Sequence, residues 1–159
     1  MGSRWIKQRD LHSCGPVALM NLQKWIGHPV TYASDFHYWK KKCKCNHDGS
    51  PLDAFVNSLY SIKDIKISPR SIPSLETIDS ALQQGKAVVM KSAFMGKKEL
   101  DGHYFLVTER SPRHFFCVNT NFQHEWVSKA SFKAQWLQNY LYYCDECGVA
   151  PYAWIVRKI

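Results

Sequence analysis

The sequence predicts a single α+β domain spanning residues 1–159, with helices in the first half and an antiparallel β-sheet in the second. Composition supports one domain, because 159 residues with 45% hydrophobic and 14% aromatic content suffice for one ordinary core. Apolar residues recur at helical spacing up to Ser61, whereas β-rich runs separated by turns dominate after Gly85. We expect a functional site in the cleft between the two halves.

Three helices are expected in the first half. Apolar residues at helical spacing predict a helix over Pro16–Ile26, and Gly27 just beyond it is a typical stop. A shorter helix is predicted over Tyr32–Lys42. The third follows Ser50 and Pro51, residue types that are favoured at the N-cap and at the first helical position.

The second half is predicted to consist mainly of strands. DIKISPR alternates in polarity as a short strand does, and SLETIDSALQQG then predicts a helix that is capped by Ser74 and ends at Gly85. The runs AVVMKSAF, HYFLVTER, HFFCVNT and YAWIVRKI are rich in β-forming residues. A further helix is expected in SFKAQWLQNYLYY, between the last two of these strands.

The chain is basic, with a formal net charge of +8 from 21 Lys and Arg against 13 Asp and Glu. Part of the excess lies in the run WKKKCK at Trp39–Lys44. A short lysine run without a nucleic-acid motif favours a solvated face over a polyanion site, so nucleic acid is not an expected partner. No stretch approaches the roughly 18 apolar residues of a membrane span, and the N-terminus lacks the apolar region of a signal peptide, which predicts a cytoplasmic protein.

Cys14 stands directly before Gly-Pro at the start of the first predicted helix. The unpaired N–H groups and positive end of a helix stabilise a thiolate, so this position favours a lowered pKa and a nucleophilic sulfur. Gly15 is expected to let a substrate approach the backbone. The alternative is a small buried cysteine that packs at the start of a core helix.

Three polar residues elsewhere would complete thiol catalysis. His103 opens the predicted strand HYFLVTER and is the candidate general base. Asn119 ends the next strand, so its amide oxygen is expected to accept from the imidazole N–H, with Asn121 as the substitute if the register slips by two. Gln8, six residues before Cys14, is a candidate oxyanion donor. Each alone is typical of an ordinary surface, turn or core residue, and only their ordered combination predicts a catalytic site.

The motifs Q-x5-C-G-P-x-A-L, from Gln8, and G-H-Y-F-L-V, from Gly102, resemble those of papain-like cysteine peptidases, in particular the branch that processes the double-glycine leader peptides of bacteriocins. The resemblance implies a papain-like fold, with the catalytic cysteine at a helix N-terminus packed on an antiparallel sheet. It also implies Gln8 as oxyanion donor and Cys14 as nucleophile. His103 would then be the general base and acid, and Asn119 would orient the imidazole. That branch usually has Asp followed by Pro at the last position, so the Asn departs from its pattern.

The expected function is hydrolysis of a peptide or isopeptide bond through a thiolate and an acyl-enzyme, without a cofactor. In leader-processing transporters such a domain is fused to membrane and ATPase modules. Because this chain has no P-loop motif and no membrane span, either a separate transporter or other partner protein or a different substrate is expected. Acyl transfer to an amine would use the same residues. A non-catalytic papain-like module, binding a protein tail or nucleic acid through its cleft and basic face, is the alternative, although the intact Cys-His-Gln set favours an enzyme.

Two cysteine pairs form a second motif. C-K-C at Cys43 and Cys45, with C-D-E-C at Cys144 and Cys147, could supply four thiolates to a structural zinc, with His47 as a substitute ligand. C-x-C is the poorer half-site, and free or redox-active thiols are the alternative. A zinc held by both pairs would join the two halves of the domain and leave the peptidase chemistry unchanged.

Overall fold

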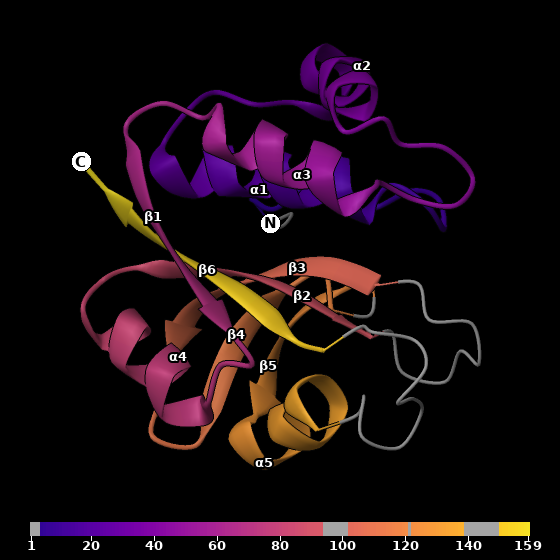
Figure 1. Ribbon diagram of the computed structural model, residues 1–159. Coiled ribbons are helices and arrows are strands. Elements are labelled where there is room, and N and C mark those ends of the chain that lie inside the picture. Colours follow the sequence, from indigo (N-terminus) through magenta and orange to yellow (C-terminus); the bar gives the residue numbers. More distant parts are fainter. Residues whose placement is uncertain (1–3, 94–101, 121, 139–149) are drawn as a thin grey trace.

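The computed structural model describes residues 4–93, 102–120, 122–138 and 150–159. A six-stranded antiparallel sheet forms the centre, with α1, α2 and α3 over one face and α4 and α5 over the other (Figure 1). The helices and strands confirm the predicted α+β class. In chain order they are α1 (Cys14–Ile26), α2 (Tyr32–Lys42), α3 (Leu52–Tyr60), β1 (Ile65–Ser71), α4 (Leu75–Gln83), β2 (Ala87–Ala93), β3 (Gly102–Arg110), β4 (His114–Val118), β5 (His124–Ser128), α5 (Lys129–Phe132), a π-helical turn (Lys133–Leu137) and β6 (Tyr152–Lys158).

The first three helices follow local sequence signals. α1 starts earlier than predicted, at Cys14 itself, and ends at Gly27, whose left-handed φ of +106° lets its N–H bond carbonyls of the last turn. α2 has the predicted bounds, because the Thr31 side chain accepts a hydrogen bond from the N–H of Ser34. α3 begins at Leu52 with Pro51 at its N-cap and no side-chain capping bond, so the predicted positions of Ser50 and Pro51 are each one residue early. None of the helices within the described residues combines the length and the apolar character needed to cross a membrane.

The strand order is β1-β6-β2-β3-β4-β5, so β6 lies between two strands that are formed much earlier in the sequence. β1 tolerates Pro69 because an edge strand need not donate every N–H to a neighbour. β3 and β4 form the predicted hairpin, in which Leu106 lies opposite Val118. β5, at the other edge of the sheet, is not predicted from the sequence. Its segment HEWVS is short and lacks a clear alternation of apolar and polar residues.

Two apolar cores lie on opposite faces of the sheet. The first lies beneath α1, α2 and α3, where Phe55 of α3 stacks on Tyr104 of β3 with ring centroids 3.9 Å apart. The second lies beneath α4 and α5, where Phe105 packs against Trp136 with centroids 4.7 Å apart. Adjacent residues of β3 therefore serve different cores, as the alternation of a strand requires.

A polar cluster fixes α4 on the second face. Asp79 Oδ1 accepts from Arg110 Nε at 2.6 Å and from Lys129 Nζ at 2.8 Å. These two bonds join α4 to the end of β3 and to the start of α5.

The helix predicted in SFKAQWLQNYLYY begins earlier than expected, at Lys129, because Ser128 caps it by accepting from the N–H of Ser131. It forms α5 and continues as the π-helical turn Lys133–Leu137. The later part of the predicted helix lies outside the described residues.

Candidate active site

Cys14 is the first residue of α1, and its side chain is only 7% exposed. The turn before it is held by Asp10, whose Oδ1 accepts from the N–H groups of His12 and Ser13 at 2.8 Å each. The backbone N–H of Tyr104 lies close enough to the Cys14 sulfur to lower the pKa of the thiol. Cys14 therefore lies where the start of α1 meets the opening of β3.

The Cys14 thiol holds its proton more firmly than the sequence predicts. Burial raises its pKa to about 11, while hydrogen bonds from the N–H groups of Tyr104, Gly15 and Cys14 itself oppose the rise without cancelling it. The expected lowering of the pKa is therefore wrong for the ligand-free site. The physical reason is that the close packing of α1 against β3, which supplies the N–H donors, also removes the sulfur from water.

Gly15 has a packing role that differs from the expected one. A Cβ atom built on it would lie 2.7 Å from Ser50 Oγ and 3.1 Å from Ser50 Cβ. The space beside the glycine is thus filled by the loop that leads into α3, and it is not open to a substrate. A glycine is needed here so that this loop can pack on the start of α1.

Gln8, His103 and Asn119 are buried and are brought together by hydrogen bonds. His103 Nε2 lies 2.6 Å from the backbone carbonyl oxygen of Asn119. Asn119 Nδ2 donates to Gln8 Oε1 at 2.7 Å, and Gln8 Nε2 donates to the carbonyl oxygen of Asp10 at 2.7 Å. The segment that enters α1 is therefore joined to β3 and to the end of β4.

Asn119 bonds the imidazole through its backbone, whereas the sequence analysis expects its amide oxygen to do so. Its φ of +70° is left-handed, a conformation that Asn tolerates better than most residues. The turn at this position aims its carbonyl at His103 and its amide at Gln8. Among the described residues, Asn119 Oδ1 has no hydrogen-bond partner. Asn121, the substitute candidate, lies outside the described residues.

The Asn119 carbonyl also fixes the tautomer of His103. A carbonyl oxygen can only accept, so the neutral imidazole carries its proton on Nε2 and presents Nδ1 as an acceptor. The rings of Trp136 and Phe105 stack beside the imidazole, with centroids 5.8 Å and 5.9 Å away. Hydrogen bonding and aromatic packing therefore both restrict its orientation.

Comparison with known proteins gives matches at the level of structure. No protein-family model matches the chain, and no curated protein matches it. The peptidase domain of Streptococcus ComA, a bi-functional ABC transporter of a quorum-sensing pathway, superposes with a TM-score of 0.69 at 15% identity, over 97% of each chain. The chain has the fold of a double-glycine leader peptidase domain. A double glycine motif protease from an AMS/PCAT transporter, solved with its leader peptide, matches with a TM-score of 0.64 at 9% identity, over 98% of this chain and 91% of that one. The Streptococcus mutans ComA peptidase domain matches with a TM-score of 0.63 at 13% identity, over 98% and 99%.

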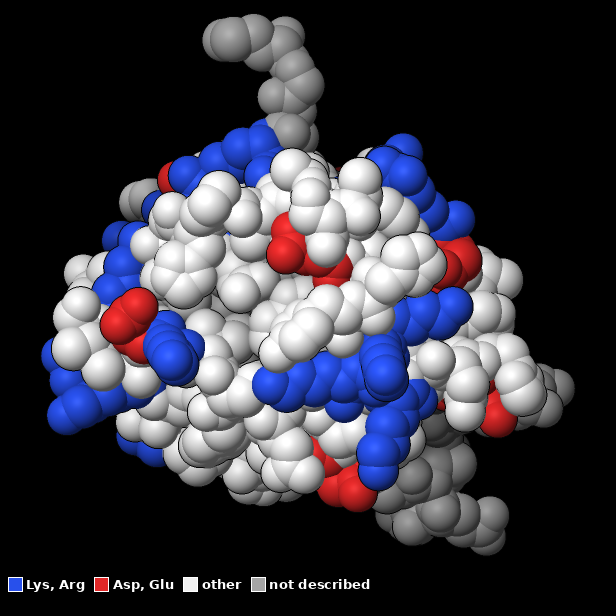
Figure 2. Space-filling view, turned by 90° about the horizontal axis from the view of Figure 1, so that it is seen from above, with Lys and Arg blue, Asp and Glu red and all other residues white. Residues whose placement is uncertain are grey.

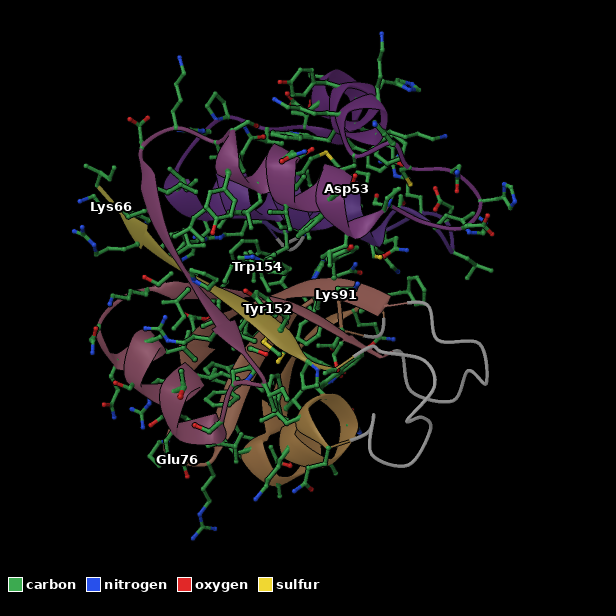
Figure 3. The ribbon with its side chains drawn as sticks, viewed as in Figure 1. Asp53, Lys66, Glu76, Lys91, Tyr152 and Trp154 are labelled. Carbon is green, nitrogen blue, oxygen red and sulfur yellow. The ribbon has the colours of Figure 1, made fainter. Side chains whose placement is uncertain are left out.

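Within this leader-peptidase fold, Lys91 is a feature of the site that is not predicted from the sequence. It lies on β2 directly opposite Tyr104, the residue whose backbone N–H lowers the pKa of the Cys14 thiol. The Lys91 ammonium lies 5.9 Å from the centroid of the Tyr104 ring, between the sheet and α3 (Figure 3). Its place inside the apolar run AVVMKSAF is the signal that could have identified it, because a charged residue in a buried strand is unusual.

The zinc site expected from the two cysteine pairs cannot be completed from the residues described. Cys43 is fully buried and Cys45 half-buried, and the Cys45 thiol lies 3.3 Å from the carbonyl oxygen of His12. Cys144 and Cys147 lie outside the described residues. In the part of the chain that the structure describes, no three potential ligands converge as a metal site would require. The zinc site therefore stays a prediction.

Proposed function

We propose that the chain is a cysteine peptidase in which Cys14 is the nucleophile and the substrate is a peptide or protein. The observation that carries the proposal is that Cys14, at the start of α1, lies next to the first residues of β3. These residues include His103 and Tyr104. The fold shared with leader-peptidase domains supports the same assignment. Leader peptides with a Gly-Gly motif are therefore the first substrates to test, and a separate transporter partner stays a prediction.

The raised pKa of Cys14 affects how the reaction would begin. Because the resting thiol is neutral, its proton would pass to Nδ1 of His103 as the sulfur attacks the substrate carbonyl. The S–C bond forms, His103 returns the proton to the leaving amine, and the C–N bond breaks. Water then attacks the acyl-enzyme, with His103 as base, and the thiol is regenerated.

Gln8 is the proposed side-chain donor to the oxyanion. Its amide carries two N–H hydrogens, of which one is donated to the Asp10 carbonyl, so a second hydrogen is left for the developing negative charge. Asn119 holds the Gln8 amide in this orientation by donating to Oε1. Asn119 would therefore position both the base and the oxyanion donor.

The alternative, a non-catalytic module, receives less support from the surface. Seen from above the helical layer, Lys and Arg side chains form several separate groups divided by uncharged and acidic surface (Figure 2). A polyanion is best held by a continuous basic stripe. The buried network of Gln8, His103 and Asn119 would also have no evident use in such a module.

A degenerate peptide library that includes Gly-Gly sequences tests the proposal. We expect the wild-type chain to release new N-termini, detected by mass spectrometry, and Cys14→Ala to release none. Cys45→Ala, which removes a half-buried thiol outside the proposed reaction, is the matched control and should stay active. Products that carry an added amine nucleophile instead of a free carboxylate would assign acyl transfer. If the wild type and Cys14→Ala give the same products, the proposal is wrong.

A further inference from the structure

A groove of about 440 Å³ lies between α3 and the sheet, next to the candidate active site. One wall is formed by Leu52, Val56 and Tyr60, which are four residues apart and so share one face of α3. Leu52 and Tyr60 are 46% and 50% exposed, which is high for large apolar side chains.

The floor of the groove comes from three neighbouring strands. Tyr152 of β6 lies between Lys91 of β2 and Ser71 of β1 in the sheet register. In the next row, Trp154 of β6 lies opposite Pro69 of β1. These five residues line the groove, and the two aromatic rings are 5.0 Å apart. The floor is therefore mainly apolar and aromatic, with the hydroxyl of Ser71 on one side of Tyr152 and the only charged side chain among the described lining residues, Lys91, on the other.

Lys91 places a positive charge at the β2 side of the groove, close enough to Cys14 for the two groups to interact electrostatically. Its ammonium is half-buried, and among the described residues no carboxylate, including Asp53 at the start of α3, lies within 4.0 Å of it. Figure 3 shows Lys91, Tyr152 and Trp154 between α3 and the sheet, whereas Lys66 lies at the far end of the sheet. A half-buried cation without an acidic partner can gain most from a carboxylate that a ligand supplies.

The electrostatics agree with this placement. Burial lowers the pKa of Lys91, and the nearby Cys14 thiolate form raises it. A bound carboxylate would favour the charged form of Lys91 in the same way.

We propose that this groove binds a segment of the peptide substrate that carries an acidic side chain, paired with Lys91, followed by apolar side chains along Leu52, Val56 and Tyr60. The inference rests on the proposed peptidase function, and it deepens that function by naming Lys91 as a specificity-determining residue. The complementarity of one cation with a mainly apolar groove favours an acidic and apolar segment over a purely apolar or a basic one.

Affinity selection separates this inference from the question of catalysis. Degenerate dodecapeptides are passed over immobilised Cys14→Ala chain, which lacks the proposed nucleophile, and bound peptides are sequenced by mass spectrometry. We expect Asp and Glu to be enriched about tenfold at one position that precedes or follows apolar residues, as is reasonable for one desolvated charge pair. Lys91→Gln in the same background should remove the acidic enrichment, and Lys91→Glu should replace it with enrichment of Lys and Arg.

Lys66→Glu is the matched control, because it makes the same charge change at an exposed strand position outside the groove and should leave the selection unchanged. Lys91→Arg should retain the acidic preference, and thermal unfolding shows whether each variant is folded. An acidic preference that is absent, or that survives in both Lys91→Gln and Lys91→Glu, would overturn the inference. Binding with the expected preference but no hydrolysis by the wild-type chain would leave the groove assignment standing and refute the peptidase.

Discussion

Substitution of Gly15 by alanine tests whether the start of α1 is positioned by its contact with the loop before α3. The new Cβ would lie 2.7 Å from Ser50 Oγ, well inside van der Waals contact. Ser50 is buried at this atom and its carbonyl oxygen accepts from the Tyr104 hydroxyl at 3.3 Å, which restricts its movement. Overpacking of this kind costs about 1–3 kcal/mol, which exceeds the gain in helix propensity of at most about 1 kcal/mol from Gly to Ala. We therefore expect Gly15→Ala to lower the free energy of unfolding by about 1–2 kcal/mol.

A double-mutant cycle with Ser50→Gly isolates the clash. Ser50→Gly removes both atoms that the new Cβ would meet, so the cost of Gly15→Ala should disappear in that background. Urea unfolding of the four proteins, followed by fluorescence, gives the coupling energy, and we expect about 1–2 kcal/mol. A coupling energy near zero would mean that Gly15→Ala acts through something other than Ser50, and the packing role assigned to Gly15 would then be wrong.

Two further predictions concern ionisable groups. Asp79→Asn should lower the free energy of unfolding at pH 7 by about 1–2 kcal/mol, because a neutral amide oxygen replaces the carboxylate that accepts two charge-assisted hydrogen bonds. Glu109→Gln, at an exposed position on β3, should change it by less than about 0.5 kcal/mol. Burial raises the pKa of Asp79, but its bonds to Arg110 and Lys129 hold that pKa below 3.8. The difference in unfolding free energy between wild type and Asp79→Asn should therefore be full above pH 4 and vanish as the pH falls through the folded pKa. A difference that persists at that low pH would contradict this. Alkylation of Cys14 by iodoacetamide in the ligand-free protein should rise roughly tenfold per pH unit between about pH 7 and 10, because burial raises its pKa to about 11, and a flat profile measured by mass spectrometry would show that the thiolate is already formed at neutral pH.

Features that depend on neighbours in the sequence could be predicted, and those that depend on burial could not. α2 has its predicted bounds because Thr31 caps it locally, and α1 ends where Gly27 adopts a left-handed φ. The pKa of Cys14 could not be predicted, because the sequence shows that the residue precedes a helix but does not show that β3 removes its sulfur from water.

The candidate site shows the same division. The order of Gln8, His103 and Asn119 along the chain predicts that they belong together, and the structure places them in one hydrogen-bonded network. That Asn119 uses its carbonyl for the imidazole depends on a positive φ at the end of β4, which no spacing rule supplies. The groove beside Lys91 could not be predicted either, because its floor joins β1, β2 and β6, whose pairing is known only from the tertiary structure.

The position of β6 has a consequence for biosynthesis. β1 and β2 are translated long before β6, yet β6 is the strand that pairs with both of them, through partners such as Ile67 with Val156 and Val88 with Ile155. A nascent chain that has emerged only as far as β5 would therefore hold β1 without its pairing partner and the groove without half of its floor. Pairings of such large sequence separation form slowly. The substrate-binding surface proposed above would thus be assembled only after residues 152–158 have left the ribosome, which separates synthesis of the nucleophile from completion of the groove beside it.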